Sequence, residues 1–328
     1  MAAESAWKLG GLSVVELGKR VFREVTEDEV ANRAAGLAYY FVLALFPAMF
    51  FIISMTGLLA SRGQEMQQAL FQYMQTAVPG SAAQLVSQTL HEVMNASGGG
   101  KLSFGLLAAI WSASAGVVAL IDALNVAYNV KDSRSFLKKR GTAIALTLAL
   151  AVLVLSALTL VLFGGQIAEW VGQRMNMGAA FTIAWKIVQW PVAIGFMLVS
   201  FSLVYYFAPN VEQRKWFWVT PGAAAGLTLW ALATVAVKVY LGFSDTYSKT
   251  YGSLGGAIVL LLWLYLTGAA VMIGAEVNSE IENAAAERLG DTEAKARGEK
   301  APGDMSDADA DAQVERGGRP PREKRPAA

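Results

Sequence analysis

Six long runs without a charged side chain constrain this 328-residue chain more than any other feature. The runs cover residues 34–61, 102–121, 141–168, 187–211, 216–237 and 250–275. A helix needs about 20 consecutive apolar residues to cross a bilayer core of roughly 30 Å, and every run is long enough. A water-soluble domain carries about 25% charged residues, whereas this chain carries 16%. The pattern therefore predicts an all-α integral membrane protein with six transmembrane helices.

The distribution of Lys and Arg predicts the orientation in the membrane. Five of these residues precede the first run, five lie between the second and third runs, two between the fourth and fifth, and nine follow the last. The opposite connections together hold five. Cytoplasmic loops carry an excess of Lys and Arg, so both termini are expected in the cytoplasm. Residues 1–33 show no cleavable signal peptide, so the first spanning helix should direct insertion into the bacterial inner membrane.

The chain is expected to have three parts. Residues 1–33 form a cytoplasmic amphipathic segment, either an interfacial helix or a helix packed under the bundle. Residues 34–283 form the transmembrane domain, with external amphipathic helices at 61–101, and residues 284–328 form a disordered cytoplasmic tail. The expected spans are about 34–61, 102–126, 141–168, 187–209, 216–242 and 250–278.

Two local motifs predict further details of the helices. The sequence Thr26-Glu27-Asp28-Glu29 matches a capping box, so the first membrane helix is expected to begin near Thr26. Gly222 and Gly226 are four residues apart, a spacing that lets two helices approach closely in lipid. We therefore expect a tight helix contact at these glycines, either as simple packing or as a surface on which the helices slide.

Polar side chains inside membrane spans are costly, so they mark candidate functional residues. Three of them follow one helix face in the second span, and two more lie near the end of the last span. They are expected either to lock helix ends or to line a hydrated pocket that is open to the cytoplasm. The candidates are Asp122, Asn125, Asn129, Glu276 and Asn278.

Two cations are the expected charge partners of the acidic candidates. Arg33 and Arg134 lie on the same side of the membrane as Asp122 and Glu276 in the predicted topology. A carboxylate paired with arginine would serve as a structural lock, whereas an unpaired one would be available to a substrate or an ion. The residue types leave both roles open.

Several motifs follow one another in a fixed order between about residues 20 and 283. They include Ala34-Ala-Gly-Leu-Ala-Tyr-Tyr-Phe, Trp111-Ser-Ala-Ser-Ala-Gly116, Tyr206-Phe-Ala-Pro209, Tyr251-Gly-Ser-Leu-Gly-Gly256 and Gly274-Ala-Glu-Val-Asn278. In these motifs the chain resembles the YihY/virulence factor BrkB family of bacterial membrane proteins, formerly labelled ribonuclease BN. The resemblance implies a six-helix inner-membrane protein with a permease or flippase role and no agreed substrate. It supplies no catalytic residues.

Three classes of function compete. A transporter or lipid flippase is favoured by the polar residues in the spans; a cavity of hydrocarbon character would indicate a lipid substrate and a small polar one a solute. A non-transporting envelope scaffold is the alternative, and homo-oligomerisation is left open. An enzyme is not expected, because the single histidine, His91, lies in the external segment. No cofactor or metal site is expected, and the net charge of +1 does not favour a nucleic-acid partner.

Overall fold

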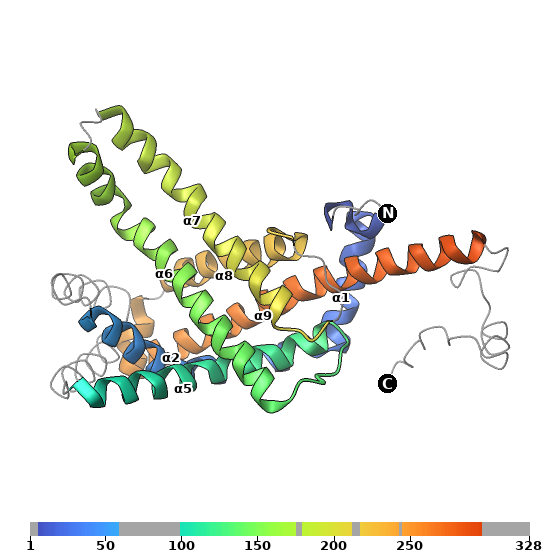
Figure 1. Ribbon diagram of the computed structural model, residues 1–328, viewed down its shortest axis with the longest axis horizontal. Helices are drawn as coiled ribbons and strands as arrows, with labels where there is room; N and C mark the ends of the chain where they lie inside the picture. The colour runs from blue at the N-terminus through green and yellow to red at the C-terminus, as the bar shows by residue number, and fades with distance from the viewer. Residues whose placement is uncertain (1–5, 59–98, 175–178, 212–216, 243–244, 297–328) are drawn as a thin grey trace.

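The structure is a computed structural model that describes residues 6–58, 99–174, 179–211, 217–242 and 245–296 (Figure 1). Every regular element in this part of the chain is a helix, so the all-α prediction is confirmed there. The elements are the 3-10 helix η1 (Ala6–Gly11) and the α-helices α1 (Val14–Glu27), α2 (Val30–Leu58), α5 (Gly99–Ala127), α6 (Phe136–Arg174), α7 (Ala179–Phe207), α8 (Pro221–Gly242) and α9 (Asp245–Ala296).

Five of these helices contain segments long and apolar enough to cross a membrane. The segments are Ala109–Ala127, Phe136–Arg174, Phe181–Phe207, Pro221–Leu241 and Gly255–Gly290. Helix α2 adds a shorter apolar stretch, Val30–Leu45. The chain is thus built as an α-helical membrane protein, and the count of six spans stays a prediction. The external segment expected at 61–101 lies almost entirely outside the described residues.

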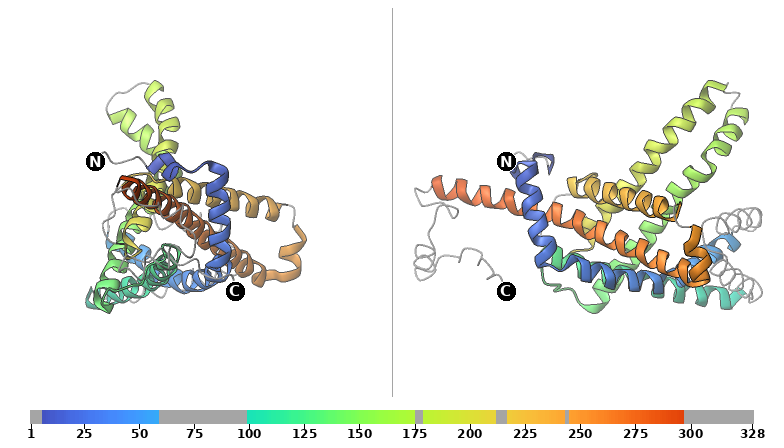
Figure 2. Two further views of the ribbon diagram at one scale, coloured as in Figure 1. Left: turned by 90° about the vertical axis from the view of Figure 1, so that its right-hand side faces the viewer. Right: turned by 180° about the vertical axis from the view of Figure 1, so that it is seen from behind.

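The helices form a bundle and a diverging hairpin. Helices α2, α5, α8 and α9 run roughly along the long axis of the molecule, whereas α6 and α7 lean away from it together (Figures 1 and 2). Helix α6 packs mainly against α7, α8 packs against α9, and α2 contacts both α5 and α9. The hairpin therefore touches the bundle near one end and separates from it toward the α6–α7 connection.

The core lies where α7 joins the bundle. Its largest buried side chains include Ile121 and Leu124 from α5, Tyr205 from α7 and Met272 from α9, together with Leu37 from α2. In lipid, such contacts stabilise a fold through close packing, because the surrounding acyl chains are as apolar as the side chains. The core thus holds α2, α5, α7 and α9 together.

The far part of the hairpin presents apolar side chains to its surroundings. Val152 of α6 and Ile187 of α7 are each 66% exposed, and Trp190 of α7 is also exposed. A helix surface that faces water is normally polar. The outside of the hairpin is therefore suited to contact with lipid.

Helices α8 and α9 cross in close contact at three glycines, which confirms the contact expected at Gly222 and Gly226. A Cβ atom added at Gly274 of α9 would lie 2.6 Å from the carbonyl oxygen of Gly222 and 2.2 Å from the hydroxyl oxygen of Tyr205. A Cβ atom at Gly222 would lie 2.1 Å from the carbonyl oxygen of Gly274. Only glycine leaves room for this approach of the two backbones.

The capping box expected at Thr26 is wrong. Thr26 lies in the last turn of α1, where its hydroxyl donates a hydrogen bond to the Phe22 carbonyl oxygen at 3.0 Å. Helix α1 ends at Glu27, Glu29 adopts a left-handed backbone with φ of 50°, and α2 begins at Val30. Residues 26–27 therefore belong to the end of α1 and not to the start of α2. Helix α1 reaches this far because it packs against α9.

Helix α1 is packed under the bundle, as one of the two interpretations of residues 1–33 expected. Leu17 and Val21 are buried against Ile281 of α9. Val15 and Phe22 remain 69% and 75% exposed on another face of α1. The helix therefore uses one apolar stripe for docking and leaves a second one open.

The disordered tail does not begin at residue 284, because α9 continues to Ala296. Ala284 is buried, Glu287 pairs with Arg20 of α1 at 3.1 Å, and Arg288 donates a hydrogen bond to the Gly11 carbonyl oxygen. Alanine-rich sequence favours helix, and these contacts with η1 and α1 extend it. Residues 297–328 lie outside the described part of the chain.

Candidate functional site

The polar candidates gather at one end of the bundle, where α1, the α5–α6 loop (residues 128–135) and the last turn of α7 meet (Figure 1). We call this region the α1 end. Asn125 of α5 is buried there. Its side-chain amide nitrogen donates to Asp132 at 3.2 Å, and its oxygen accepts from the backbone N–H of Asn210 at 2.7 Å. Asn125 therefore ties the end of α5 to the loop and to the residues after α7.

Arg134 completes this network. Its side chain is only 6% exposed and forms an ion pair with Asp132, with 2.8 Å between Nε and Oδ1. The same guanidinium donates to the carbonyl oxygen of Ala208 at 2.8 Å. Hydrogen bonding from Arg134 holds the pKa of Asp132 below its ordinary value. Arg134 thus caps the end of α7 and joins it to the α5–α6 loop.

Asp122 lies outside this network, on the surface between α5 and α6. Its side chain is 57% exposed and pairs with Lys139 at the start of α6. Lys139 also lies 3.7 Å from Asp132. The ion pair therefore connects two helices at an accessible position.

Replacing Asp122 with asparagine is expected to change the free energy of unfolding by less than about 1 kcal/mol, because exposed ion pairs contribute little. Lys139 keeps Asp132 as a partner in this variant. Chemical denaturation of the purified protein in detergent measures the difference. A loss above about 2 kcal/mol would show that Asp122 supports the fold more than an exposed ion pair can.

Asn129 and Asn278 also lie outside the network of Asn125 and Arg134. Helix α5 ends at Ala127, and the exposed Asn129 follows it with a left-handed φ of 51°, so it does not continue the helix face. Asn278 of α9 accepts a hydrogen bond from the backbone N–H of Gly222 at 2.9 Å and donates one to Thr220 at 3.0 Å. The Gly222 N–H belongs to the first turn of α8 and has no carbonyl partner within that helix. Asn278 therefore caps α8.

Glu276 is fully buried near the contact of α9 with α1 and the α1–α2 turn. Neither expected cation reaches it. Arg33 donates to the backbone carbonyl oxygen of Asp28 at 2.8 Å, and Arg134 binds Asp132. The expected pairing of Arg33 and Arg134 with Asp122 and Glu276 is thus wrong, because each arginine has a partner close to it in sequence.

The five candidates do not share one polar cluster in the described part of the chain. No hydrogen bond or ion pair there joins Asp122 to Glu276, and each of the other candidates contacts different residues. Sequence reasoning missed Asp132, Asn210 and Thr220, which complete the two asparagine contacts. The pairing of Asp132 with Arg134 could have been predicted, because the two residues are only two positions apart in the sequence.

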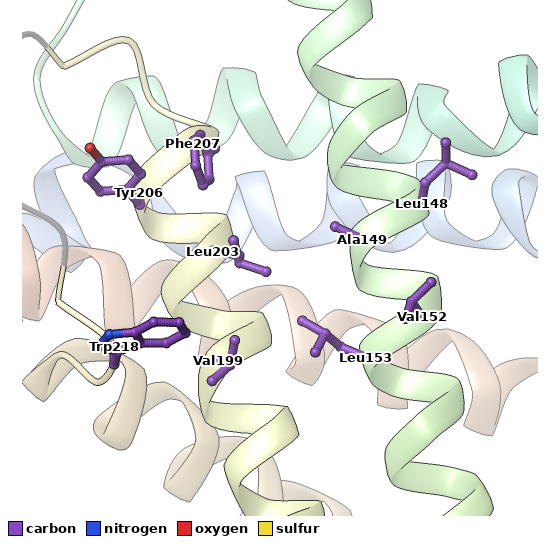
Figure 3. A pocket seen from close by; sticks show the side chains of 9 residues that line it. All are labelled: Leu148, Ala149, Val152, Leu153, Val199, Leu203, Tyr206, Phe207 and Trp218. Carbon is purple, nitrogen blue, oxygen red and sulfur yellow. The ribbon is translucent and has the colours of Figure 1, made fainter.

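An apolar groove lies beside these networks, between α6, α7 and the residues before α8 (Figure 3). Its volume is about 770 Å³, within the range of about 300–1,000 Å³ typical of ligand pockets. The lining residues are Leu148, Ala149, Val152, Leu153, Val199, Leu203, Tyr206, Phe207 and Trp218.

The groove is lined almost entirely by apolar atoms, with two polar side chains on one side. Among the described residues that line the groove, only Tyr206 in the last turn of α7 and Trp218 carry polar side-chain atoms. Figure 3 shows both on the same side of the groove, with the Tyr206 hydroxyl oxygen pointing away from α6. The carbonyl oxygens of Phe207 and Ala208, which accept hydrogen bonds from Arg134, belong to this end of α7. The body of the groove is formed by aliphatic side chains of α6 and α7. This arrangement suits an elongated apolar group.

The fold and its long apolar helices define the class of this molecule, an α-helical membrane protein. The chain belongs to the virulence factor BrkB family, whose sequence model matches residues 21–299. The resemblance seen in the sequence motifs is thereby confirmed.

Named relatives agree with this assignment. The ribonuclease-like protein YfkH of Bacillus subtilis is 37% identical over 261 residues, which are 80% of this chain and 93% of the relative. The UPF0761 membrane protein Smlt0865 of Stenotrophomonas maltophilia is 26% identical over 81% of this chain and 61% of its own length. This chain therefore spans less than two thirds of that relative. No solved structure matches this chain.

Proposed function

We propose that this protein moves a lipid, or an amphiphile with an acyl chain, across the bacterial inner membrane. The observation that carries the proposal is the apolar groove of about 770 Å³ between α6, α7 and Trp218. Lipid tails are as apolar as leucine, so an acyl chain can lie against Leu148, Val152 and Leu203 without loss of solvation. The apolar lining therefore favours a lipid substrate over a small polar solute.

The position of the groove supports this function. Its walls come from the hairpin that leans away from the bundle, and Val152 on its wall is 66% exposed. An acyl chain can therefore enter sideways from the bilayer. The headgroup would then lie beside the last turn of α7, near Tyr206.

The orientation is part of the proposal. The excess of Lys and Arg in the first 33 residues and in the connections after α5 and α7 favours cytoplasmic termini. The α1 end, with the end of the groove at Tyr206, would then lie at the cytoplasmic surface. A lipid would enter the groove from the cytoplasmic leaflet.

Filling the groove is expected to stop lipid movement. Val152→Trp places an indole in the groove and should lower lipid binding by about 1.5–3 kcal/mol, the value of one buried apolar side chain, which is tenfold or more in rate at limiting lipid. The measurement is loss of fluorescence of a labelled phospholipid in proteoliposomes after an impermeant quencher is added. Ile187→Trp is the matched control, because Ile187 is equally exposed and does not line the groove.

Two outcomes would contradict the proposal. If wild-type protein leaves the lipid in its original leaflet with every headgroup tested, the chain is not a flippase, and the scaffold function gains support. If Val152→Trp and Ile187→Trp slow the movement equally, lipid does not use this groove.

A further inference from the structure

Among the described residues, Glu276 is buried without a compensating cation or hydrogen-bond donor. Its residue is 0% exposed, and neither carboxyl oxygen accepts a hydrogen bond from the described residues. A buried carboxylate without a partner costs more free energy than a typical fold can supply. Some cation must therefore accompany this side chain, or the side chain must be neutral.

The groups that act on Glu276 are all acidic. Asp28 in the α1–α2 turn, Glu24 of α1 and Glu280 of α9 are its charged neighbours. Asp28 and Glu280 are 7% and 5% exposed. Four carboxyl groups from three elements thus meet at the contact of α1 with α9, and we call them the acidic cluster.

The nearby arginines pair with other members of the cluster and not with Glu276. Arg20 lies 3.8 Å from Glu280, and Arg23 lies 3.5 Å from Glu24 with 61% of its own side chain exposed. Arg33 of α2 donates to the backbone of Asp28 and not to a carboxyl group. Burial raises the pKa of Glu24, and the negative charge of Glu280 adds to this effect. These arginines therefore offset charge at Glu280 and Glu24, but among the described residues none of them binds the carboxyl group of Glu276.

The other elements packed against α9 supply no cation to Glu276. The charged residue of η1 is Lys8, which is not among the groups that act on Glu276. In α8 the charged residue is Lys238, sixteen residues after Gly222, and Asp122 of α5 pairs with Lys139. Within the described residues, no set of three acidic or histidine side chains is placed to hold a metal ion.

We propose that Glu276 and Asp28 form a proton-binding site that keeps α1 docked against α9. Two carboxyl oxygens can form a hydrogen bond only when one of them carries a proton. A proton taken from the water at the α1 end supplies that donor and removes one negative charge from the cluster. Its release leaves like charges facing one another across the docking contact of Leu17, Val21 and Ile281, which weakens that contact.

This site is separate from the lipid groove, so its test needs no lipid movement. The chain contains no cysteine, and one introduced thiol therefore reports on α1. Leu17→Cys is buried at the docking contact, where Leu17 is 8% exposed, and Val15→Cys is the control on the open face of the same helix. The measurement is the rate of labelling of the full-length protein by an impermeant maleimide in lipid nanodiscs.

The ratio of the two labelling rates removes the ordinary effect of pH on thiol reactivity. Between about pH 6 and pH 10 the ratio of Leu17→Cys to Val15→Cys is expected to rise about tenfold or more, because opening coupled to loss of one proton changes up to tenfold per pH unit. Adding Glu276→Gln, which keeps the shape of the protonated acid, should leave the ratio low and independent of pH. Val21→Cys provides a second buried reporter.

The proposal is overturned by a ratio that does not change with pH, or that rises equally with Glu276→Gln. Infrared spectra give an independent readout that holds even if a reporter variant misfolds. The wild-type protein should show the band of a protonated carboxyl group at neutral pH. This band should be absent with Glu276→Gln. It should persist with Glu282→Gln, a change at an exposed acid of the same helix. Loss of the wild-type band when sodium replaces choline would show that a metal cation occupies the site instead.

Discussion

Gly274→Ala is expected to separate α8 from α9 and to lower the free energy of unfolding by at least about 2 kcal/mol, within the range for overpacked sites. The new methyl group would lie 2.2 Å from the hydroxyl oxygen of Tyr205 and 2.6 Å from the carbonyl oxygen of Gly222. The carbonyl belongs to a helix backbone and cannot move without moving α8. The Tyr205 hydroxyl would also lose its hydrogen bond to the Val271 carbonyl oxygen, now 2.9 Å long.

Gly195→Ala provides the matched control for this change. Gly195 lies in α7, and an added Cβ atom would meet nothing within 4 Å. Alanine is favoured over glycine in a helix by roughly 0.5–1 kcal/mol, so this variant should be slightly more stable than wild type. Thermal unfolding of both purified variants shows whether each is less or more stable than wild type. A Gly274→Ala variant as stable as wild type would show that the helices do not cross this closely.

Arg134→Ala is expected to cost about 1.5–3 kcal/mol, the value of hydrogen bonds to a charged group. Asp132, with a side chain only 15% exposed, would lose its shortest ion pair and keep only Lys139 at 3.7 Å, and the carbonyl oxygen of Ala208 would lose its donor. The end of α7 would then separate from the α5–α6 loop. Denaturation in detergent measures this loss, and Arg23→Ala, at a side chain 61% exposed, should cost far less.

The pH dependence of stability gives this prediction a second test. Arg134 holds the pKa of Asp132 below its ordinary value of 3.8, chiefly by hydrogen bonding. The stabilisation is therefore complete above about pH 3.8 and is lost as the pH falls toward the lower pKa of the folded state. In Arg134→Ala this part of the acid sensitivity should disappear. An unchanged acid limb would show that other carboxyl groups control unfolding at low pH.

The positions of the helices could be predicted well from the uncharged runs, because membrane thickness dictates their length. The run 102–121 lies in α5, and the run 141–168 lies in α6. Helix α8 begins at Pro221 and not at residue 216. Proline is favoured at the first position of a helix, and Thr220 accepts a hydrogen bond from the N–H of Ala223, so the boundary has a local cause.

The contacts of the site could be predicted less well, because they join distant parts of the chain. Asn125 and Asn278 were recognised as unusual polar residues, but their partners at Asn210 and Gly222 lie 85 and 56 residues away. Arg134 was assigned to the wrong acid because a nearby partner, Asp132, competes with distant ones. The groove could not be predicted, since Leu148 and Val152 look like any other lipid-facing residues until α7 is placed beside them.

The apolar stretch of α9 is longer than a bilayer core is thick. Gly255–Gly290 contains 36 residues, about 54 Å of helix at 1.5 Å per residue, whereas the bilayer core is roughly 30 Å thick. The glycine crossing with α8 lies near the middle of this stretch, and η1 and α1 pack on the part beyond it through Arg288 and Ile281. A helix of this length extends past the core unless it is steeply tilted, so one continuous helix joins the glycine crossing to the docked N-terminal segment.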